Sequence, residues 1–144
     1  MPDLKKDLQI YLAVKDRTER IRDEDSLVVD GFEVSAFNCA ADLWNHYRQH
    51  PVRMVITERR FGSTLSGIEL IRNVRTHFML PYTYTILLST MNSLREIQEA
   101  FAVGVDAYLI KPHNPLQLRT QVLAGLRWLA YIDSLTKTGS QAAA

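Results

Sequence analysis

The chain has 144 residues, enough for one domain with a substantial buried core. Its 17 basic and 16 acidic residues leave a formal net charge of +1, which argues against a nucleic-acid or membrane surface as the main partner. The lone Cys39 excludes an internal disulfide framework, and the sequence has neither a signal-peptide core nor an apolar run of the roughly 20 residues that a membrane helix needs, so we expect a cytoplasmic protein.

Strand and helix patterns alternate five times along the chain. Short runs rich in branched and aromatic residues predict buried strands, at residues 8–14, 32–37, 52–57, 83–88 and 107–110. Apolar residues at helical spacing predict helices between and after them, from about residue 18, then over 40–50, 68–77 and 93–103, and from 115 onward. An open parallel sheet with helices on both faces satisfies this alternation.

Local signals mark several helix ends. Asn38 can cap the second helix. Ser93 and Glu96 have the spacing of a capping box at the start of the fourth helix, and Gly104 is the residue expected just past its end. Asn114 can cap the last helix, so the boundaries of the later elements are the best defined.

Polar residues follow the predicted strands where a parallel sheet places its ligands. They are Lys15 and Asp16 after the first strand, Glu58 after the third, Ser89 and Thr90 after the fourth, and Lys111 after the fifth. Any ligand chemistry is therefore expected at this edge. A zinc site is not expected, because His46 and His50 have no carboxylate or cysteine cluster around them.

The stretch from Val103 to Pro112 reads Val-Gly-Val-Asp-Ala-Tyr-Leu-Ile-Lys-Pro and resembles the last strand and loop of response regulator receiver domains. His113 stands where that family has a phenylalanine. Residues 31–34, 66–75 and 87–90 resemble other parts of the family in the right order, so the similarity covers about residues 8–128. It implies a flavodoxin-like α/β/α fold of three layers, with five parallel strands in the order 2-1-3-4-5, and a role in two-component (phosphorelay) signal transduction.

The resemblance also implies partners and site roles. The partners would be a histidine kinase or an output domain, with a homodimer through the fourth helix, fifth strand and fifth helix, and with no direct contact to nucleic acid or membrane. In the family, acids after the first strand hold Mg²⁺ together with a phosphorylatable aspartate, while hydroxyl and ammonium groups bind the phosphoryl oxygens. The matching positions are Glu58 for the phosphoacceptor, Lys15 and Asp16 for the acidic pocket, and Ser89, Thr90, Tyr108, Lys111 and Pro112 for phosphoryl binding and switching.

Two departures change what the resemblance implies. No aspartate lies between Asp42 and Asp106, so the acceptor is missing, and a shift of one residue would only put Thr57 in its place. Lys15 replaces an acid, and Mg²⁺ tolerates a neighbouring ammonium poorly, so no metal or other cofactor is expected and Asp16 and Glu58 remain weak metal candidates.

Each of these departures leaves two interpretations. The Lys15 ammonium either neutralises the pocket acids in place of a metal or points into solvent. Glu58 either imitates part of a phosphorylated aspartate or is a solvated acid that pairs with Arg59 or Arg60.

The sequence thus predicts a pseudo-receiver that is not an enzyme and acts through protein contacts without aspartate phosphorylation. The alternative is a small α/β ligand-binding or enzymatic domain that shares with receiver domains only the winding of the chain, that is, the order of its strands and helices. Such a domain would need a phosphate-binding glycine loop or a nucleophile motif, and the sequence contains no G-x-G-x-x-G, Walker loop or G-x-S-x-G.

The last helix is predicted to continue past the sheet. We expect residues 1–128 to form the receiver-like domain and residues 129–144 a helical extension with a disordered tail. A 4-3-4-3-4 apolar pattern predicts a helix-pairing seam whose first half faces the core, formed by Leu118, Val122, Gly125, Leu129, Ile132 and Thr136.

Overall fold

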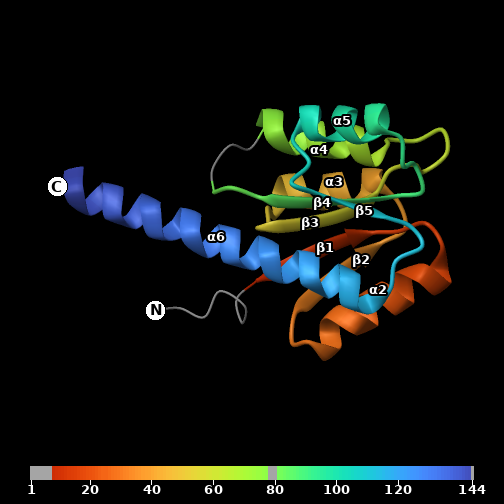
Figure 1. Cartoon of the computed structure of the whole chain (residues 1–144), viewed down its shortest axis with the longest axis horizontal. Coiled ribbons are helices and arrows are strands. Elements are labelled where there is room, and N and C mark those ends of the chain that lie inside the picture. Colours follow the sequence, from red (N-terminus) through yellow and green to blue (C-terminus); the bar gives the residue numbers. More distant parts are fainter. Residues whose placement is uncertain (1–7, 78–80, 144) are drawn as a thin grey trace.

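The computed structural model describes residues 8–77 and 81–143, with side chains as far as residue 135. Its centre is one five-stranded sheet in the order β2-β1-β3-β4-β5 (Figure 1). All neighbouring strands are parallel. The strands are β1 (Gln9–Ala13), β2 (Glu33–Phe37), β3 (Met54–Glu58), β4 (Tyr84–Ser89) and β5 (Ala107–Ile110).

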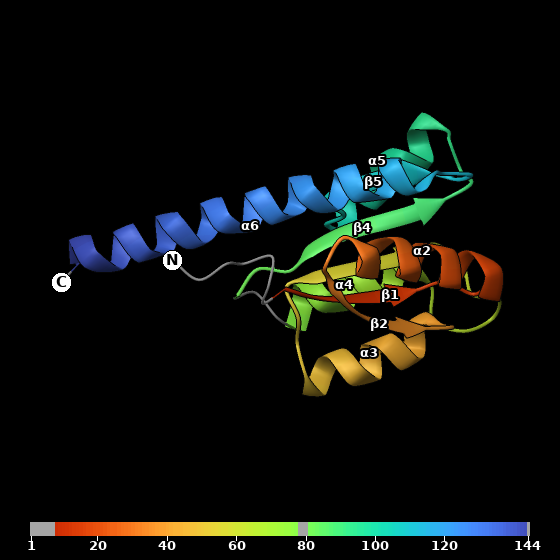
Figure 2. The same ribbon diagram turned by 90° about the horizontal axis from the view of Figure 1, so that it is seen from below.

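Helices cover both faces of the sheet. They are α2 (Arg17–Val29), α3 (Ala40–Gln49), α4 (Gly67–His77), α5 (Leu94–Val103) and α6 (Pro115–Ala143). Helices α2 and α6 lie on one face and α3, α4 and α5 on the other (Figures 1 and 2). The predicted fold class, strand order and three layers are therefore confirmed.

The sheet is buried on both faces, which explains the apolar strands. Ile10 and Leu12 belong to the core beneath α2 and α6, whereas Tyr11 and Ala13 of the same strand belong to the core beneath α3 and α4. Successive side chains of a strand point to opposite faces, so a strand covered on both sides needs apolar residues at every position.

Most of the predicted helix ends are confirmed. Ser93 caps α5 by accepting a hydrogen bond from the Glu96 N–H, and Gly104 ends the helix with a φ of +110°. Asn114 accepts from the Gln117 N–H at 2.9 Å. The prediction for Asn38 is wrong, because the N-cap of α3 is the next residue, which makes no side-chain capping bond.

A polar network fixes the opposite edge of the sheet, away from the strand ends discussed below. Arg75 Nη2 lies 2.7 Å from Asp106 Oδ2, and its Nη1 donates to the Thr83 carbonyl oxygen at 2.7 Å. Tyr82 donates its hydroxyl to Asp106. Burial, together with this hydrogen bond, raises the pKa of Tyr82, so the hydroxyl keeps its proton and the network stays intact through the neutral range.

Helix α6 is anchored further along than expected. Leu129 is fully buried in the core, and Asp133 accepts two hydrogen bonds from Arg53, at 2.9 and 3.1 Å. The compact part of the chain therefore reaches past the boundary predicted after residue 128. The helix continues to Ala143, so the structure has helix over residues 139–143 where the sequence suggests a disordered tail.

Within residues 8–77 and 81–143, no helix is both long and apolar enough to span a bilayer.

Candidate functional site

Glu58 stands at the carboxyl end of β3, at the centre of the sheet edge where ligands are expected. Its Oε2 accepts a hydrogen bond from the Lys15 backbone N–H at 2.8 Å, and its side chain is only 14% exposed. The start of α4 lies close by, because a Cβ on Gly67 would overlap the Glu58 carbonyl oxygen. Glu58 is therefore held by the strand and loop around it, and not left to move in solvent.

Lys111 lies between two carboxylates. Its Nζ is 2.8 Å from Oε2 of Glu19 and 3.8 Å from Oε1 of Glu58, and its side chain is 13% exposed. The Glu19 contact was not foreseen from the sequence, although Glu19 lies in the first turn of the helix that follows β1. The Lys111 ammonium thus neutralises charge from both Glu58 of β3 and Glu19 of α2.

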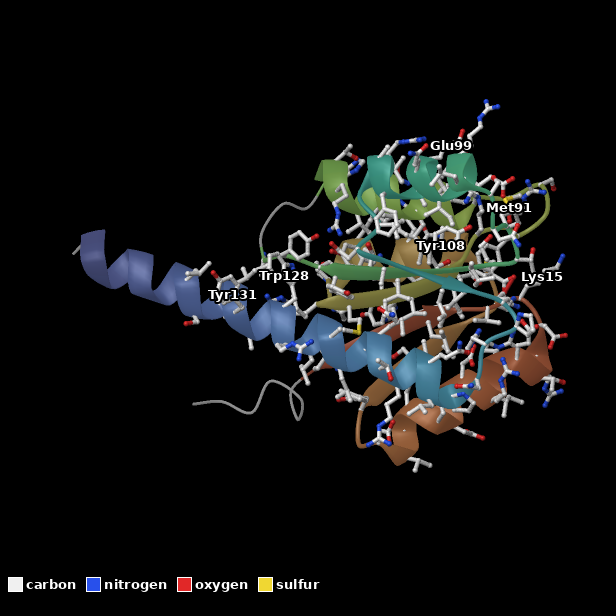
Figure 3. The ribbon with its side chains drawn as sticks, viewed as in Figure 1. Lys15, Met91, Glu99, Tyr108, Trp128 and Tyr131 are labelled. Carbon is white, nitrogen blue, oxygen red and sulfur yellow. The ribbon has the colours of Figure 1, made fainter. Side chains whose placement is uncertain are left out.

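Lys15 and Asp16 do not form the pocket that was predicted for them. Asp16 caps α2, its Oδ2 accepting from the Glu19 N–H at 2.9 Å. The Lys15 side chain is exposed and points away from the sheet edge (Figure 3). The sequence left two interpretations of Lys15 open, and in the structure its ammonium faces solvent. The cation beside Glu58 is Lys111.

Ser89 and Tyr108 clasp the loop between β4 and α5. Ser89 is buried, and its Oγ accepts from the Met91 N–H at 3.0 Å. Tyr108 donates its hydroxyl to the Met91 carbonyl oxygen at 2.6 Å, and both residues are labelled in Figure 3. Ser89 of β4 and Tyr108 of β5 are thereby linked through the backbone of Met91.

Arg59 reinforces this clasp from below α5. Its Nη1 lies 3.4 Å from the Tyr108 hydroxyl and 3.2 Å from the Glu96 carbonyl oxygen, and its Nη2 pairs with Glu99 at 3.3 Å. The possible pairing of Glu58 with Arg59 or Arg60 is not found. Arg59 instead joins the end of β3 to α5 and to Tyr108.

A small pocket of about 140 Å³ opens at this edge. It is lined by Glu58, Arg59, Arg60, Leu88, Ser89, Thr90, Met91 and Lys111. Four predicted site residues therefore share one cavity, namely Glu58, Ser89, Thr90 and Lys111. Lys15, Asp16, Tyr108 and Pro112 do not line it. Pro112 is exposed and follows Lys111 through a cis peptide bond.

The donor set does not fit the Mg²⁺ that the resemblance implies. Asp16 is engaged as a helix cap, Glu58 accepts a backbone N–H, and an ammonium lies 3.8 Å from Glu58. Mg²⁺ requires near-octahedral oxygen ligands from carboxylates and water. In the part of the chain that the structure describes, no three histidine, cysteine or acidic side chains are grouped to hold a metal ion.

We expect Arg59→Ala to lower the free energy of unfolding by about 1.5–3 kcal/mol, the usual cost of losing hydrogen bonds to a charged group. Amide exchange in α5 and in the Met91 loop should become faster, as measured by hydrogen–deuterium exchange with mass spectrometry. Glu99→Gln is the matched control. Because Glu99 is 60% exposed, losing its charge should cost only about 0–1 kcal/mol. Equal effects of the two variants would contradict the role of Arg59 in the clasp.

Comparisons with known proteins agree with the fold of this chain. A family model described as "Response regulator receiver domain" matches residues 16–123. Response regulator GtcR of Aneurinibacillus migulanus is 33% identical over 84 residues, which are 58% of this chain and 33% of that protein. Chemotaxis response regulator CheY4 of Vibrio cholerae has a TM-score of 0.75 at 21% identity, covering 82% of this chain and 98% of that one.

A further structural likeness is to a longer protein. The structure of a "probable two-component system response regulator/GGDEF domain protein" has a TM-score of 0.80 at 22% identity, covering 88% of this chain and 52% of that one. The curated relatives are longer too: this chain spans from 33% to 48% of their length.

Proposed function

This chain belongs to the response regulator receiver domain family of two-component signal transduction, and from that premise we propose that it is a pseudo-receiver. It keeps the fold and the interaction surfaces of the family but does not accept a phosphoryl group at the usual position. One observation carries the proposal: the carboxylate at the end of β3 is Glu58, and it is already bound by the Lys15 N–H and faced by Lys111.

The charge pattern around Glu58 supports a fixed signalling state. In a receiver, the lysine after the fifth strand binds phosphoryl oxygens; here Lys111 is bound to Glu19 and lies beside Glu58. Glu58 supplies a single permanent charge, against the roughly two charges of a phosphoryl group. We propose that this ion-paired arrangement, together with the Arg59 clasp, holds the β4–α5 loop in one conformation.

The proposed output is contact with other proteins and not catalysis. Ser89 Oγ accepts a hydrogen bond from the Met91 N–H, and in the part of the chain that the structure describes no histidine or carboxylate is hydrogen-bonded to this hydroxyl to act as a base. A histidine kinase, an output domain or a second copy are the partners we propose, within the cytoplasm. The longer relatives support an output domain as one of them.

The test is incubation of the protein with a small acyl phosphate and Mg²⁺, followed by intact-mass measurement. We expect no phosphoryl adduct, because no acceptor aspartate exists and the donor set does not suit the metal that the transfer requires. A phosphorylatable receiver treated in the same way provides the positive control. A stoichiometric adduct on this chain would falsify the pseudo-receiver proposal.

A further inference from the structure

The Lys111 ammonium is shared unequally between two carboxylates. Its Nζ lies 2.8 Å from Glu19 Oε2, which is hydrogen-bond distance, but 3.8 Å from Glu58 Oε1, which is not. Glu58 Oε2 accepts from the Lys15 N–H, whereas Oε1 makes no hydrogen bond within the part of the chain that the structure describes. Glu19 of α2 therefore holds Lys111 more closely than Glu58 does.

The loop that carries Lys111 is anchored independently of this ion pair. The Lys111 N–H donates to the Ser89 carbonyl oxygen at 2.8 Å. Two residues further on, the buried His113 side chain lies 2.9 Å from Asp23. Asp23 and Glu19 are four residues apart on α2, so they share one face of the helix, and the loop after β5 lies along that face. A change at Glu19 can therefore move the Lys111 side chain without releasing the loop.

A second position for the ammonium is close by. On its flexible four-carbon stem, Nζ needs to move by only about 1 Å to come within hydrogen-bond distance of Glu58 Oε1. Lys111 and Glu58 are 13% and 14% exposed, against 36% for Glu19, so an ion pair between Lys111 and Glu58 is less screened by water. Both residues line the small pocket, so the ammonium stays at its wall in either position.

We propose that Glu19 is a positioning residue that draws the Lys111 ammonium toward α2 and keeps its contact with Glu58 loose. The contact across the pocket tightens when the Glu19 charge is removed. The inference rests on the proposed function, since the Glu58–Lys111 contact is where this chain imitates a phosphorylated receiver, and it adds that the extent of the imitation is set from α2. The resemblance to receiver domains assigns no role to Glu19.

The first experiment measures how fast the Lys111 amine of the folded chain is acetylated by a trace of acetic anhydride. Mass spectrometry of peptides gives the rate, and the exposed Lys15 amine serves as the internal reference. We expect Glu19→Gln to raise the rate less than about twofold, because Glu58 takes over the ammonium, and Glu19→Gln with Glu58→Gln to raise it about tenfold, because both partners are lost. A full rise in Glu19→Gln alone, or none in the double variant, would overturn the inference.

Asp30→Asn is the matched control. Asp30 also lies at an end of α2 and pairs with Arg119 of α6 at 3.3 Å, but it does not contact Lys111. Combined with Glu58→Gln, it should leave the acetylation rate of Lys111 unchanged. A rise equal to that of the Glu19→Gln combination would show that any loosening of α2 frees the ammonium, and would refute a specific role for Glu19.

The second experiment separates positioning from a merely structural role. Urea unfolding of Lys111→Met, Glu58→Gln and the variant with both changes gives the coupling between these two side chains, with and without Glu19→Gln. We expect the coupling, expressed as a factor in the unfolding equilibrium constant, to rise about fivefold when Glu19 is replaced. If Glu19 only stabilised the fold, it would change every variant by the same factor, so an unchanged coupling would contradict the proposal.

These measurements involve no phosphoryl transfer. A phosphoryl adduct in the acyl phosphate test would overturn the proposed function and leave the role of Glu19 in positioning Lys111 intact. Conversely, loss of the Glu19 effect would leave the pseudo-receiver proposal standing, because that proposal depends on Glu58 and its bond to the Lys15 N–H.

Discussion

His113→Phe is expected to lower the free energy of unfolding by about 3–5 kcal/mol, although the family has phenylalanine at this position. His113 Nε2 lies 2.9 Å from Oδ1 of Asp23, and the two side chains are 0% and 1% exposed. Phenylalanine would leave the Asp23 carboxyl group buried without that donor. Arg22, at 3.6 Å, would be the remaining nearby cation. A buried charge that loses its partner is one of the few causes of losses this large.

The double variant Asp23→Leu with His113→Phe tests the cause. Replacing a buried pair by apolar residues of similar size is often neutral or stabilising, so we expect the double variant to return to within about 1 kcal/mol of the unaltered chain. Urea unfolding followed by circular dichroism of the unaltered chain, Asp23→Leu, His113→Phe and the double variant gives four free energies and the coupling between the two sites. If the two single losses simply added in the double variant, the pair would not be the source of the effect.

Rebuilding the acidic pocket is expected to restore phosphoryl transfer. The Lys15 backbone N–H lies 2.8 Å from the Glu58 carboxylate. The shorter side chain of Lys15→Asp, unlike the exposed Lys15 ammonium, can therefore turn toward position 58 and add a hard oxygen ligand of the kind that Mg²⁺ prefers. Because the Lys15 ammonium already faces solvent, the expected gain comes from the added oxygen ligand and not from the removal of that charge. Ser89 and Lys111 are already in the cavity to bind the transferred group.

The measurements are calorimetric titration with Mg²⁺ and intact mass after incubation with an acyl phosphate. We expect Mg²⁺ binding and one phosphoryl group per chain for the double variant. Lys15→Ala with Glu58→Asp is the matched control: it removes the ammonium without adding a ligand and should bind Mg²⁺ more weakly. A folded double variant that ignores Mg²⁺ would show that these two positions are not what disables the site.

The fold was predictable because its signals are local. Strand β5 begins and ends at the predicted residues, and Ser93 and Gly104 bound α5 as expected. Each of these features depends on residues within a few positions of one another, through side-chain alternation, capping bonds or a left-handed glycine. The failed prediction for Asn38 was also local: α3 begins at Ala40 as expected, but its N-cap is Cys39, which makes no side-chain capping bond.

The site was predictable only in part. The order of strands brought Glu58, Ser89 and Lys111 to one edge, as the parallel sheet requires. The partners of each charge were not predictable: Lys111 binds Glu19, Arg59 binds Glu99, and Lys15 faces solvent. Lys111, Arg59 and Lys15 each have a long, flexible side chain that can reach several acidic residues. Only the packed structure selects among these partners.

By itself the sequence determined the alternation of strands and helices, the absence of any aspartate between Asp42 and Asp106, and the loss of an acid at Lys15. Only the tertiary structure decided that Asp23 meets His113 across 90 residues, and that α6 buries the stripe of Leu118 and leaves that of Trp128 exposed. The reason is physical. Periodicity specifies which residues share a face, but the rotation of a helix and the pairing of distant charges are set by the surfaces against which they pack.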